Sequence, residues 1–366
     1  MKASESNPNY PSKVREMTNY TIREIKKVCK DIGPRPSGEE NERKAQDYVA
    51  DSMSKVADSV VKEKFELHPK AFMGWVPLDV ILMTISVILT LLSYFDVLPS
   101  ASTAFSVVSV VLTSLAIIFT FFEFLLYKKF LDPFFPKRET YNVVCTRKAA
   151  GETKRRIVFS GHIDSAYEWY FTHLGGGKLL TTMIALAFGA IAITLAASIV
   201  SFFDVPNGVR VTAIVVLFVC LIPILMCSKF VNWKLCVPGA NDNLTGVFAS
   251  MSVLRYMAAN DIRFENTEVV CVSMACEEAG LRGAKEYVKK HCGEDDVETV
   301  FVGTDTLRDF DDMGVYNKDM TGTVKLDKQA AAMVKHASDI AGYNLPYSSV
   351  FFGSSDAAAI QQGGMK

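Results

Sequence analysis

The sequence predicts an α/β fold that is interrupted by two transmembrane helical hairpins. Along the polar part of the chain, short β-rich runs alternate with stretches of helical periodicity, which is typical of a mainly parallel sheet covered by helices on both faces. Hydrophobic residues make up 49% of the 366 residues, and most of this excess lies in four long apolar blocks. These observations argue against both a purely soluble and a purely membrane-embedded protein.

The overall composition narrows the class of protein further. Lys and Arg number 39 against 40 Asp and Glu, so the net charge of −1 gives no basic excess that would indicate nucleic-acid binding. Charged residues make up 22% of the chain, and together with the high apolar content this argues against a disordered chain. We therefore expect a folded protein with no nucleic-acid partner.

The polar part of the chain contains regular helix and strand patterns. Apolar residues recur at helical spacing over residues 22–32, and Gly33-Pro34 ends this predicted helix. Ser37 and Glu40 have the spacing of a capping box, which predicts the start of a second helix. The same criteria predict strands over residues 60–67, 141–146, 156–160, 268–274, 298–302 and 348–352, and helices over residues 244–257, 281–291 and 328–341.

Four apolar blocks have the length of membrane spans. A membrane-spanning helix needs about 20 apolar residues, and buried core helices are usually shorter and rarely apolar on every face. The first block is the weakest of the four because Asp79 interrupts its start. The blocks cover residues 75–95, 97–122, 179–203 and 211–228.

Short turns join these blocks in pairs, which predicts two hairpins inserted into one discontinuous domain. We expect this α/β domain to comprise residues 1–72, 128–178 and 231–366, with the hairpins at residues 73–127 and 179–230.

The distribution of basic residues predicts the side of the membrane on which the polar part lies. The two turns contain only one basic residue, Arg210, whereas the other flanks of the blocks are basic, which indicates the cytoplasmic side. Eight cysteines without paired spacing suit reduced thiols in a cytosol-facing protein. We expect a multipass protein of the cytoplasmic membrane whose polar domain faces the cytoplasm. The basic flanking residues are Lys128, Lys129, Lys137, Arg138, Lys178, Lys229 and Lys234.

Polar side chains follow three of the predicted strands, and a fourth group precedes a predicted helix. Because open parallel sheets bind ligands beyond the carboxyl ends of their strands, we expect these side chains to converge at one edge. The strand-end residues are His162 and Asp164, Glu277 and Glu278, and Asp305. The fourth group is Gly239-Ala240-Asn241-Asp242-Asn243.

Each of these signals is weak by itself, but their joint placement favours a metal site. A His-x-Asp pair is more often structural than ligating, and Asn-Asp-Asn before a helix is usually a cap. Several carboxylates brought together repel one another unless a cation neutralises them. Imidazole and carboxylate ligands suit zinc, with manganese or cobalt as alternatives.

The order of these motifs resembles that of the family-28 metallopeptidases. These are co-catalytic di-zinc exopeptidases that include many bacterial aminopeptidases, glutamate carboxypeptidase and glutaminyl cyclases. The segment Glu277-Glu278-Ala279-Gly280-Leu281-Arg282-Gly283 and the stretch Gly33-Pro34-Arg35-Pro36-Ser37-Gly38 both contribute to the resemblance. It implies a three-layer, mainly parallel or mixed sheet of the zinc-exopeptidase type, and the two hairpins lie outside the family's pattern.

The resemblance also implies roles for the candidate ligands. Asp242 would bridge two divalent metal ions, most simply zinc. His162 and Asp305 would complete one metal site, and Glu278 would ligate the other.

Two further residues would act beside the metals. Glu277 would be the general base that takes a proton from the metal-bridging water and passes it to the leaving amine. Asp164 would lie behind His162 and orient its ring.

One departure from the family concerns the last metal ligand. The family takes it from a histidine near the C-terminus, and Gly353-Ser354-Ser355-Asp356 resembles the segment before that histidine. The sequence reaches Lys366 without it. We therefore expect the second metal site to be incomplete and the C-terminal end of the fold to be missing.

These arguments predict a membrane-bound, zinc-dependent aminopeptidase that hydrolyses N-terminal residues from peptides. A carboxypeptidase or a glutaminyl-cyclase-like enzyme on the same site remains an alternative, because nothing in the sequence fixes which end of the substrate is bound. A non-catalytic membrane binding or sensor protein with an incomplete metal site is the alternative from a different class.

Overall fold

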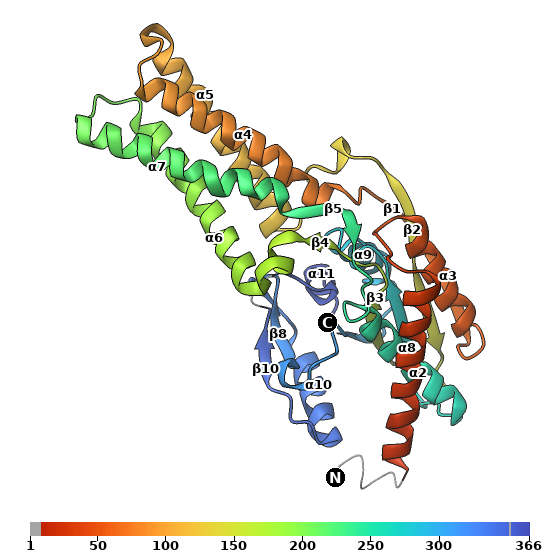
Figure 1. Cartoon of the computed structure of the whole chain (residues 1–366). Helices are drawn as coiled ribbons and strands as arrows, with labels where there is room; N and C mark the ends of the chain where they lie inside the picture. The colour runs from red at the N-terminus through yellow and green to blue at the C-terminus, as the bar shows by residue number, and fades with distance from the viewer. Residues whose placement is uncertain (1–8, 351–352) are drawn as a thin grey trace. The chain divides into compact units, whose positions relative to one another are not determined.

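The computed structural model of the chain describes residues 9–350 and 353–366 (Figure 1). The chain divides into two compact units, each built from segments that are far apart in the sequence. Unit 1 comprises Met1–Pro69, Lys137–Ala166 and Cys236–Lys366, and unit 2 comprises Lys70–Pro136 and Tyr167–Leu235.

A mixed five-stranded sheet forms the centre of unit 1, with the strand order β1-β2-β6-β3-β7 among the described residues. The pairs β1/β2 and β2/β6 are antiparallel, whereas β6/β3 and β3/β7 are parallel. The predicted α/β class with a mixed sheet is therefore confirmed. The strands are β1 (Ser59–Leu67), β2 (Arg138–Arg147), β3 (Arg155–His162), β6 (Thr267–Met274) and β7 (Glu298–Gly303).

Helices lie on both faces of this sheet. Successive side chains of a strand point to opposite faces, so neighbouring residues of β2 show what covers each face. Val143 and Cys145 of β2 are buried in one apolar core with side chains of α2, α3 and α8. Asn142, the residue before Val143, points the other way and donates to the carbonyl of Gly283 at the start of α9. The helices of unit 1 are α2 (Tyr10–Asp31), α3 (Glu40–Met53), α8 (Leu244–Ala259), α9 (Arg282–His291), η5 (Phe310–Asp312), α10 (Lys328–Ala341) and α11 (Asp356–Gln362).

Two local predictions for unit 1 were wrong. Ser37 does not cap α3, because its hydroxyl donates to the carboxylate of Asp164 instead, at 2.6 Å. The last predicted strand does not join the main sheet: β10 (Tyr347–Ser349) pairs in parallel with β8 (Val315–Asp319), which is also paired with β9 (Val324–Lys325). Residues 351 and 352 of that predicted strand lie outside the described residues.

Unit 2 consists of two helical hairpins. A two-stranded ribbon, β4 (Tyr167–Trp169) with β5 (Val231–Cys236), joins the ends of the second hairpin. The helices are α4 (Ala71–Tyr94), η1 (Pro99–Ala101), α5 (Ser102–Phe119), the π-helical η2 (Thr120–Leu125), η3 (Asp132–Phe134), α6 (Tyr170–Val200), α7 (Asn207–Met226) and η4 (Cys227–Lys229).

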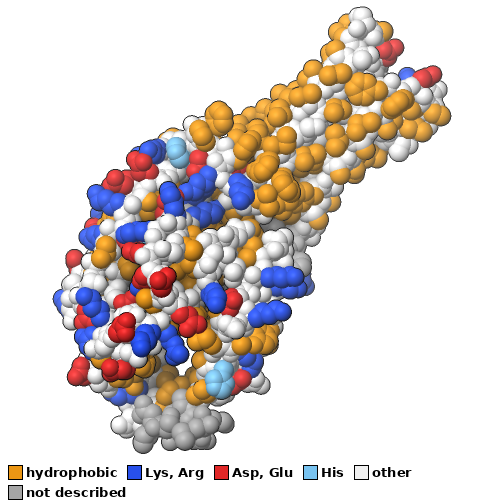
Figure 2. All heavy atoms as spheres, turned by 180° about the vertical axis from the view of Figure 1, so that it is seen from behind, with side chains coloured by type: hydrophobic (Ala, Val, Ile, Leu, Met, Phe, Trp, Pro, Cys, Tyr) orange, Lys and Arg blue, Asp and Glu red, His pale blue; other side chains and the backbone are white. Residues whose placement is uncertain are grey.

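Four helical stretches in the described part of the chain are long and apolar enough to cross a membrane. Apolar side chains predominate on the face of the hairpins that Figure 2 shows. The exposed apolar residues of these helices include Ile81, Val215 and Ile222, each more than half exposed. An apolar exterior suits helices that face lipid. The insertion in a membrane and the cytoplasmic orientation stay predictions.

A cluster of hydroxyl groups lies between the helices of unit 2. This hydroxyl cluster is completely buried. The oxygens of Ser86 and Ser109 lie 2.6 Å apart, and Ser109 and Ser198 lie 2.7 Å apart, so α4, α5 and α6 are joined by hydrogen bonds. The members of the cluster are Ser86, Thr90, Ser109, Thr113 and Ser198.

Candidate metal centre

The candidate site lies where three adjacent parallel strands of unit 1 end. His162 is the last residue of β3, and it lies in register with Met274, the last residue of β6. Glu277 and Glu278 follow β6, while Asp305 follows β7. The parallel pairing brings these strand ends to one edge of the sheet, as predicted from the sequence.

Two glycines let α8 approach this edge closely. A Cβ atom on Gly161 would lie 2.4 Å from the backbone of Gly246, and a Cβ on Gly246 would lie 2.2 Å from the carbonyl oxygen of Thr304. Asn243 caps the helix, because its Oδ1 accepts from the N–H of Gly246 at 2.9 Å, and its Nδ2 donates to Thr304. This packing sets Asp242, the preceding residue, beside the strand ends.

The predicted side chains converge on the imidazole of His162. From its Nε2 atom, Asp242 Oδ1 lies at 3.0 Å, Asp305 Oδ2 at 3.7 Å and Glu277 Oε2 at 3.8 Å. Two groups of side chains could each hold a metal ion, because within each group the potential ligand atoms all lie within 4.8 Å of one another. One group is His162, Asp242 and Asp305, and the other is His162, Glu277 and Glu278. Both groups lie in unit 1.

The electrostatics of the site fit a bound cation. Burial, together with the neighbouring carboxylates, raises the pKa of Glu277 and of Glu278 well above the ordinary value. Burial also raises the pKa of Asp305 to about 6, against the opposing effect of His162. Burial by itself would lower the pKa of His162, but Glu277, Asp164 and Asp242 raise it well above its usual range. Divalent cations would relieve this repulsion, and the imidazole and carboxylate donors suit zinc.

One side of the centre is closed and the other is open. The side chains of His162 and Asp164 are 2% and 0% exposed, and that of Glu277 is 10% exposed. In contrast, the side chains of Asp242 and Asp305 are 54% and 35% exposed. A substrate can therefore reach the centre from the side of Asp242 and Asp305.

Asp164 supports both the histidine and the glutamate pair. Its Oδ1 lies 3.4 Å from Nδ1 of His162 and accepts from the backbone N–H of Glu277 at 3.1 Å. Its Oδ2 accepts from the N–H of Glu278 at 3.1 Å and from the hydroxyl of Ser37. Asp164 therefore lies beside His162 and also accepts two backbone hydrogen bonds, which hold the loop of Glu277 and Glu278.

Arg35 is a buried residue whose importance the sequence did not indicate. Its Nε donates to the carbonyl of Ile163 at 2.6 Å, Nη1 to those of Gly33 and Pro238 at 2.8 Å, and Nη2 to that of Gly239 at 3.0 Å. One guanidinium therefore ties the N-terminal loop to the two segments that carry His162 and Asp242. In the sequence, Arg35 belonged to a stretch that contributed only to the family resemblance.

Glu42 is a second buried residue that supports the site. Its Oε2 accepts from the N–H of Gly38 at 3.0 Å and from the hydroxyl of Thr140 at 2.6 Å, and its Oε1 accepts from the N–H of Cys276 at 2.9 Å. Burial and the nearby charge of Asp164 raise the pKa of Glu42 to about 7. No sequence signal marked it, since it lies within an ordinary helical pattern.

Asp356, at the start of α11, adds another carboxylate near the centre. Its side chain is buried, and its Oδ1 has no hydrogen-bond partner among the described residues. Burial, with contributions from Asp164 and Asp305, raises the pKa of Asp356 to about 7. The sequence singled out the segment that contains Asp356 only because it resembles the one before the family's last histidine.

Comparison with known proteins gives a family match and several similar folds. Residues 227–366 match the sequence model of Peptidase family M28. No curated protein matches the chain. Three solved structures are similar: a glutaminyl cyclase from an Acidobacteriales bacterium (TM-score 0.50, 11% identity, covering 95% of this chain and 76% of that chain), an aminopeptidase from Aneurinibacillus sp. strain AM-1 (0.50, 12%, 95% and 83%), and BSAP, a zinc aminopeptidase from Bacillus subtilis (0.51, 13%, 95% and 83%).

At these identities the similar structures establish the fold, while the sequence match points to the family. The expected resemblance is therefore confirmed: this chain resembles the family M28 peptidases in sequence over residues 227–366 and has a fold similar to that of the zinc exopeptidases.

Proposed function

We propose that this chain is a membrane-bound, zinc-dependent aminopeptidase that removes N-terminal residues from peptides. The observation that carries the proposal is the convergence of one imidazole and several carboxylates at the carboxyl edge of the unit 1 sheet. The four long apolar helices support the membrane location.

The proposed ligands divide between two zinc ions. His162, Asp242 and Asp305 would hold one ion, and Asp242 with Glu278 would hold the other. Bound there, zinc would supply Lewis acidity, which polarises a substrate carbonyl and lowers the pKa of a water molecule.

Glu277 is the proposed proton carrier. Its carboxylate would take a proton from the attacking water and give it to the nitrogen of the leaving amine. A general base of this kind contributes about 10²–10⁴-fold to a rate. The hydrogen bond from the N–H of Glu277 to Asp164 fixes the start of this loop, so the side chain is held at the edge of the sheet.

Asp242 and Asp305 are the exposed members of the site. Because both are proposed zinc ligands, their charge would be neutralised by the metal and does not choose between the free amine and the free carboxylate of a peptide. The aminopeptidase is proposed first because two of the similar structures are aminopeptidases.

Purified protein loaded with zinc tests the proposal with four substrates: an aminoacyl anilide, its N-acetylated form, a peptide blocked at its N-terminus and a peptide with N-terminal glutamine. We expect cleavage of the free aminoacyl anilide and release of the N-terminal glutamine without cyclisation, no cleavage of the two N-blocked substrates, and loss of both activities with a chelator. Cleavage of the N-blocked peptide would favour a carboxypeptidase, and cyclisation of the glutaminyl peptide would favour a cyclase. Absence of both zinc and turnover would favour a binding or sensor protein.

The role of Glu277 is tested by the variant Glu277→Gln. We expect kcat to fall by about 10²–10⁴-fold, with the zinc content retained. Glu298→Gln is the matched control, because Glu298 is an exposed glutamate at the opposite end of a strand, in register with Arg155 at the start of β3. Full activity of Glu277→Gln would contradict the assigned base.

A further inference from the structure

The lysines of unit 2 all lie at one end of its helices, and we name this group the lysine collar. They flank the start of α4, the end of η2, the start of α6 and the end of η4, which are the four hairpin ends opposite to the turns. The members of the collar are Lys70, Lys128, Lys129, Lys178, Lys229 and Lys234.

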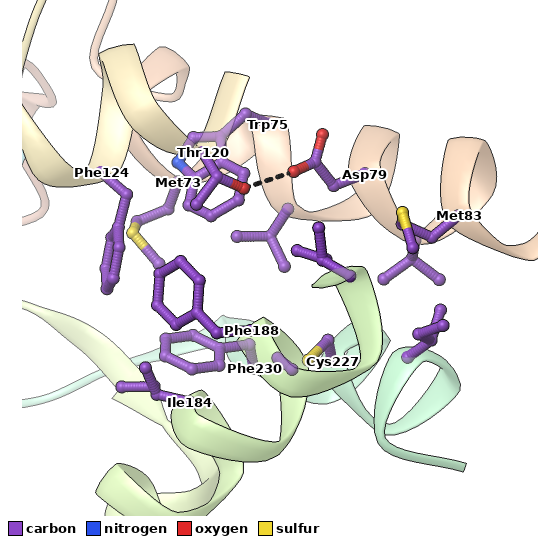
Figure 3. Close-up of a pocket in the computed structure, with 15 residues that line it drawn as sticks. Met73, Trp75, Asp79, Met83, Thr120, Phe124, Ile184, Phe188, Cys227 and Phe230 are labelled. Atoms are coloured by element: carbon purple, nitrogen blue, oxygen red, sulfur yellow. Dashed lines mark hydrogen bonds between the residues drawn. The ribbon is translucent and has the colours of Figure 1, made fainter. Parts of the chain in front are cut away.

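The four hairpin ends that carry the collar lie together. One cavity, shown in Figure 3, is lined by side chains from all four ends, each close in the sequence to a lysine of the collar. These lining residues are Met73, Phe124, Ile184 and Phe230. The lysine collar therefore belongs to a single end of unit 2, and it can be considered without reference to unit 1.

The acidic residues of unit 2 do not offset the charge of the collar at its surface. Two of the acidic residues, Asp96 and Asp204, are exposed but lie in the two turns, at the opposite end of the hairpins. At the collar end, the Glu168 side chain is 14% exposed and accepts from Asn232 at 2.9 Å. The remaining three are buried, and they are Asp79, Glu123 and Asp132.

The ammonium groups of the collar are exposed and mostly unpaired. Apart from Lys129, no lysine of the collar has an ion-pair partner among residues 9–350 and 353–366. In unit 1, by contrast, Lys44 and Lys62 each pair with a carboxylate, at 2.7 and 2.6 Å. A single exposed lysine is an ordinary solvated side chain, but several unpaired lysines at one end of an apolar bundle create a positive potential that attracts anions.

Aromatic side chains at the same end indicate the depth of the collar in a bilayer. Trp169 packs against Phe230 with ring centroids 5.3 Å apart, and Trp233 packs against Tyr167 at 5.0 Å. Tryptophan and tyrosine are enriched where a membrane meets water. When the four apolar helices span a bilayer, the lysine collar therefore lies at the level of the lipid headgroups.

We propose that the lysine collar binds the anionic headgroups of one membrane leaflet, with lipid phosphate groups as the partners of the lysines. This inference rests on the membrane location in the proposed function. Ammonium groups form charge-assisted hydrogen bonds with phosphate oxygens, and basic residues next to a membrane span attract anionic lipids. The turn end has Arg210 as its one basic residue beside two exposed aspartates, so it should show no such preference.

Quenching of tryptophan fluorescence by brominated lipids tests this proposal, because Trp169 and Trp233 lie at the collar end. The full chain is reconstituted in equimolar phosphatidylcholine and phosphatidylglycerol, and the bromines, close to the headgroup, are carried by one lipid or by the other. We expect the anionic lipid to associate with the chain at least about fivefold more strongly than phosphatidylcholine. Fivefold corresponds to about 1 kcal/mol, the contribution of one lysine near an anionic surface.

Salt and free phosphate identify the source of the anionic group. At about 1 M salt the Debye length falls to about 3 Å, so the preference for phosphatidylglycerol should weaken clearly. At equal ionic strength, inorganic phosphate should displace phosphatidylglycerol no better than chloride does. Displacement by phosphate alone would indicate a site for a soluble anion and would overturn the proposal.

Two variants with matched changes of charge test the collar directly. The collar variant should lose the preference for phosphatidylglycerol, and arginine at the same positions should retain it. The control variant changes exposed lysines of unit 1 and should behave as the unaltered chain does. The collar variant carries Lys70→Gln, Lys128→Gln, Lys178→Gln, Lys229→Gln and Lys234→Gln, and the control variant carries Lys26→Gln, Lys30→Gln, Lys55→Gln, Lys318→Gln and Lys328→Gln.

Three further results would overturn the proposal: equal association of the two lipids, a preference that salt leaves unchanged, or equal loss in the collar and control variants. A collar that pairs with an acidic protein gives the first of these results. If the collar variant fails to fold, the salt series on the unaltered chain decides.

Flotation of the chain with vesicles of phosphatidylcholine alone measures membrane insertion separately. A chain that floats but shows no lipid preference contradicts this inference alone. A chain that does not float contradicts both this inference and the membrane location in the proposed function. Neither measurement depends on peptidase activity.

Discussion

Unit 1 buries charged side chains that bond to the backbone, whereas unit 2 buries mainly hydroxyl groups that bond to one another. In unit 1, Arg35, Glu42 and Asp164 each join backbone groups from segments far apart in the sequence. In unit 2, Ser86 and Ser109 exchange hydrogen bonds within the hydroxyl cluster. Charged hydrogen bonds are stronger, but a charge that loses its partners is costly to bury.

This difference matches what each unit is proposed to do. A site with several carboxylates needs loops that hold them close despite their repulsion, and charge-assisted bonds to the backbone provide this. The helices of unit 2 do not need charge-assisted bonds to pack, because neutral hydroxyl groups can hydrogen-bond from one helix to the next. Three carboxylates, Asp79, Glu123 and Asp132, are buried exceptions to this pattern in unit 2.

The largest effect expected in this comparison is that of Arg35→Met. The change leaves four backbone carbonyls without their donor, two of them buried and two partly buried. We therefore expect the free energy of unfolding of unit 1 to fall by about 3–5 kcal/mol. Hydrogen exchange of the β3 and β6 amides measures this, since both strands belong to unit 1.

Arg308→Met is the matched control for Arg35→Met, because the side chain of Arg308 is 71% exposed and pairs with its neighbour Asp309. It should change stability by less than about 0.5 kcal/mol. A loss below about 1 kcal/mol for Arg35→Met would mean that the carbonyls find other donors, and the proposed dependence of unit 1 on charged bonds would be wrong.

The next effect concerns the pH dependence contributed by Glu42, whose pKa is raised to about 7 by burial and by Asp164. Below about pH 4.5 the carboxyl is protonated in both the folded and unfolded states, so its stabilising contribution is fully present. Between about pH 4.5 and 7 the carboxyl ionises in the unfolded state but stays protonated in the folded state, so roughly 3 kcal/mol is lost by the time the pH has risen through 7. Stability of the unaltered chain minus that of Glu42→Gln should therefore fall between pH 4.5 and 8.

Comparing the two proteins at each pH isolates Glu42 and its interaction with Asp164, because the titrating groups that do not interact with Glu42 cancel. The measurement is hydrogen exchange of the β2 amides at increasing denaturant concentration. β2 carries Thr140, whose hydroxyl donates to Glu42. Glu139→Gln serves as the control, since the Glu139 side chain is 59% exposed, and its difference profile should be flat. A difference that grows with pH would show that the donors around Glu42 favour the ionised form.

Most of the site residues that the sequence predicted lie at the end of a strand or directly follow one in the chain. His162, Glu277 and Asp305 each follow a recognisable strand, and parallel pairing then brings them together. Arg35 and Glu42 could not be predicted in this way, because their partners are backbone groups at distances such as 203 and 234 residues. A backbone carbonyl leaves no trace in the identity of the residue that carries it.

The same reasoning explains the errors and successes elsewhere in the fold. Ser37 had the spacing of a helix cap, but it donates to the carboxylate of Asp164, which is 127 residues away and a stronger acceptor. The four apolar helices were predictable because their signal is the length of the apolar run, which Asp79 weakens only in the first. The hydroxyl cluster was not, because serine and threonine occur at many positions of these helices and only packing selects which ones meet.

The smallest expected effect is that of Ser109→Ala in the hydroxyl cluster. It tests the unit 2 half of the comparison between the two units. The change removes contacts with Ser86, Thr90 and Ser198, and interhelical hydrogen bonds in membrane proteins contribute about 0.6–1.7 kcal/mol. We expect a loss of about 1 kcal/mol, measured by tryptophan fluorescence during unfolding in micelles, since all three tryptophans lie in unit 2. Ser114→Ala on the same helix is the control, because among the described residues its hydroxyl bonds within α5 alone, to the carbonyl of Val110. If Ser109→Ala were as destabilising as Arg35→Met, the hydroxyl cluster would be as essential to unit 2 as buried charge is to unit 1, and the contrast between the units would be one of chemistry alone and not of strength.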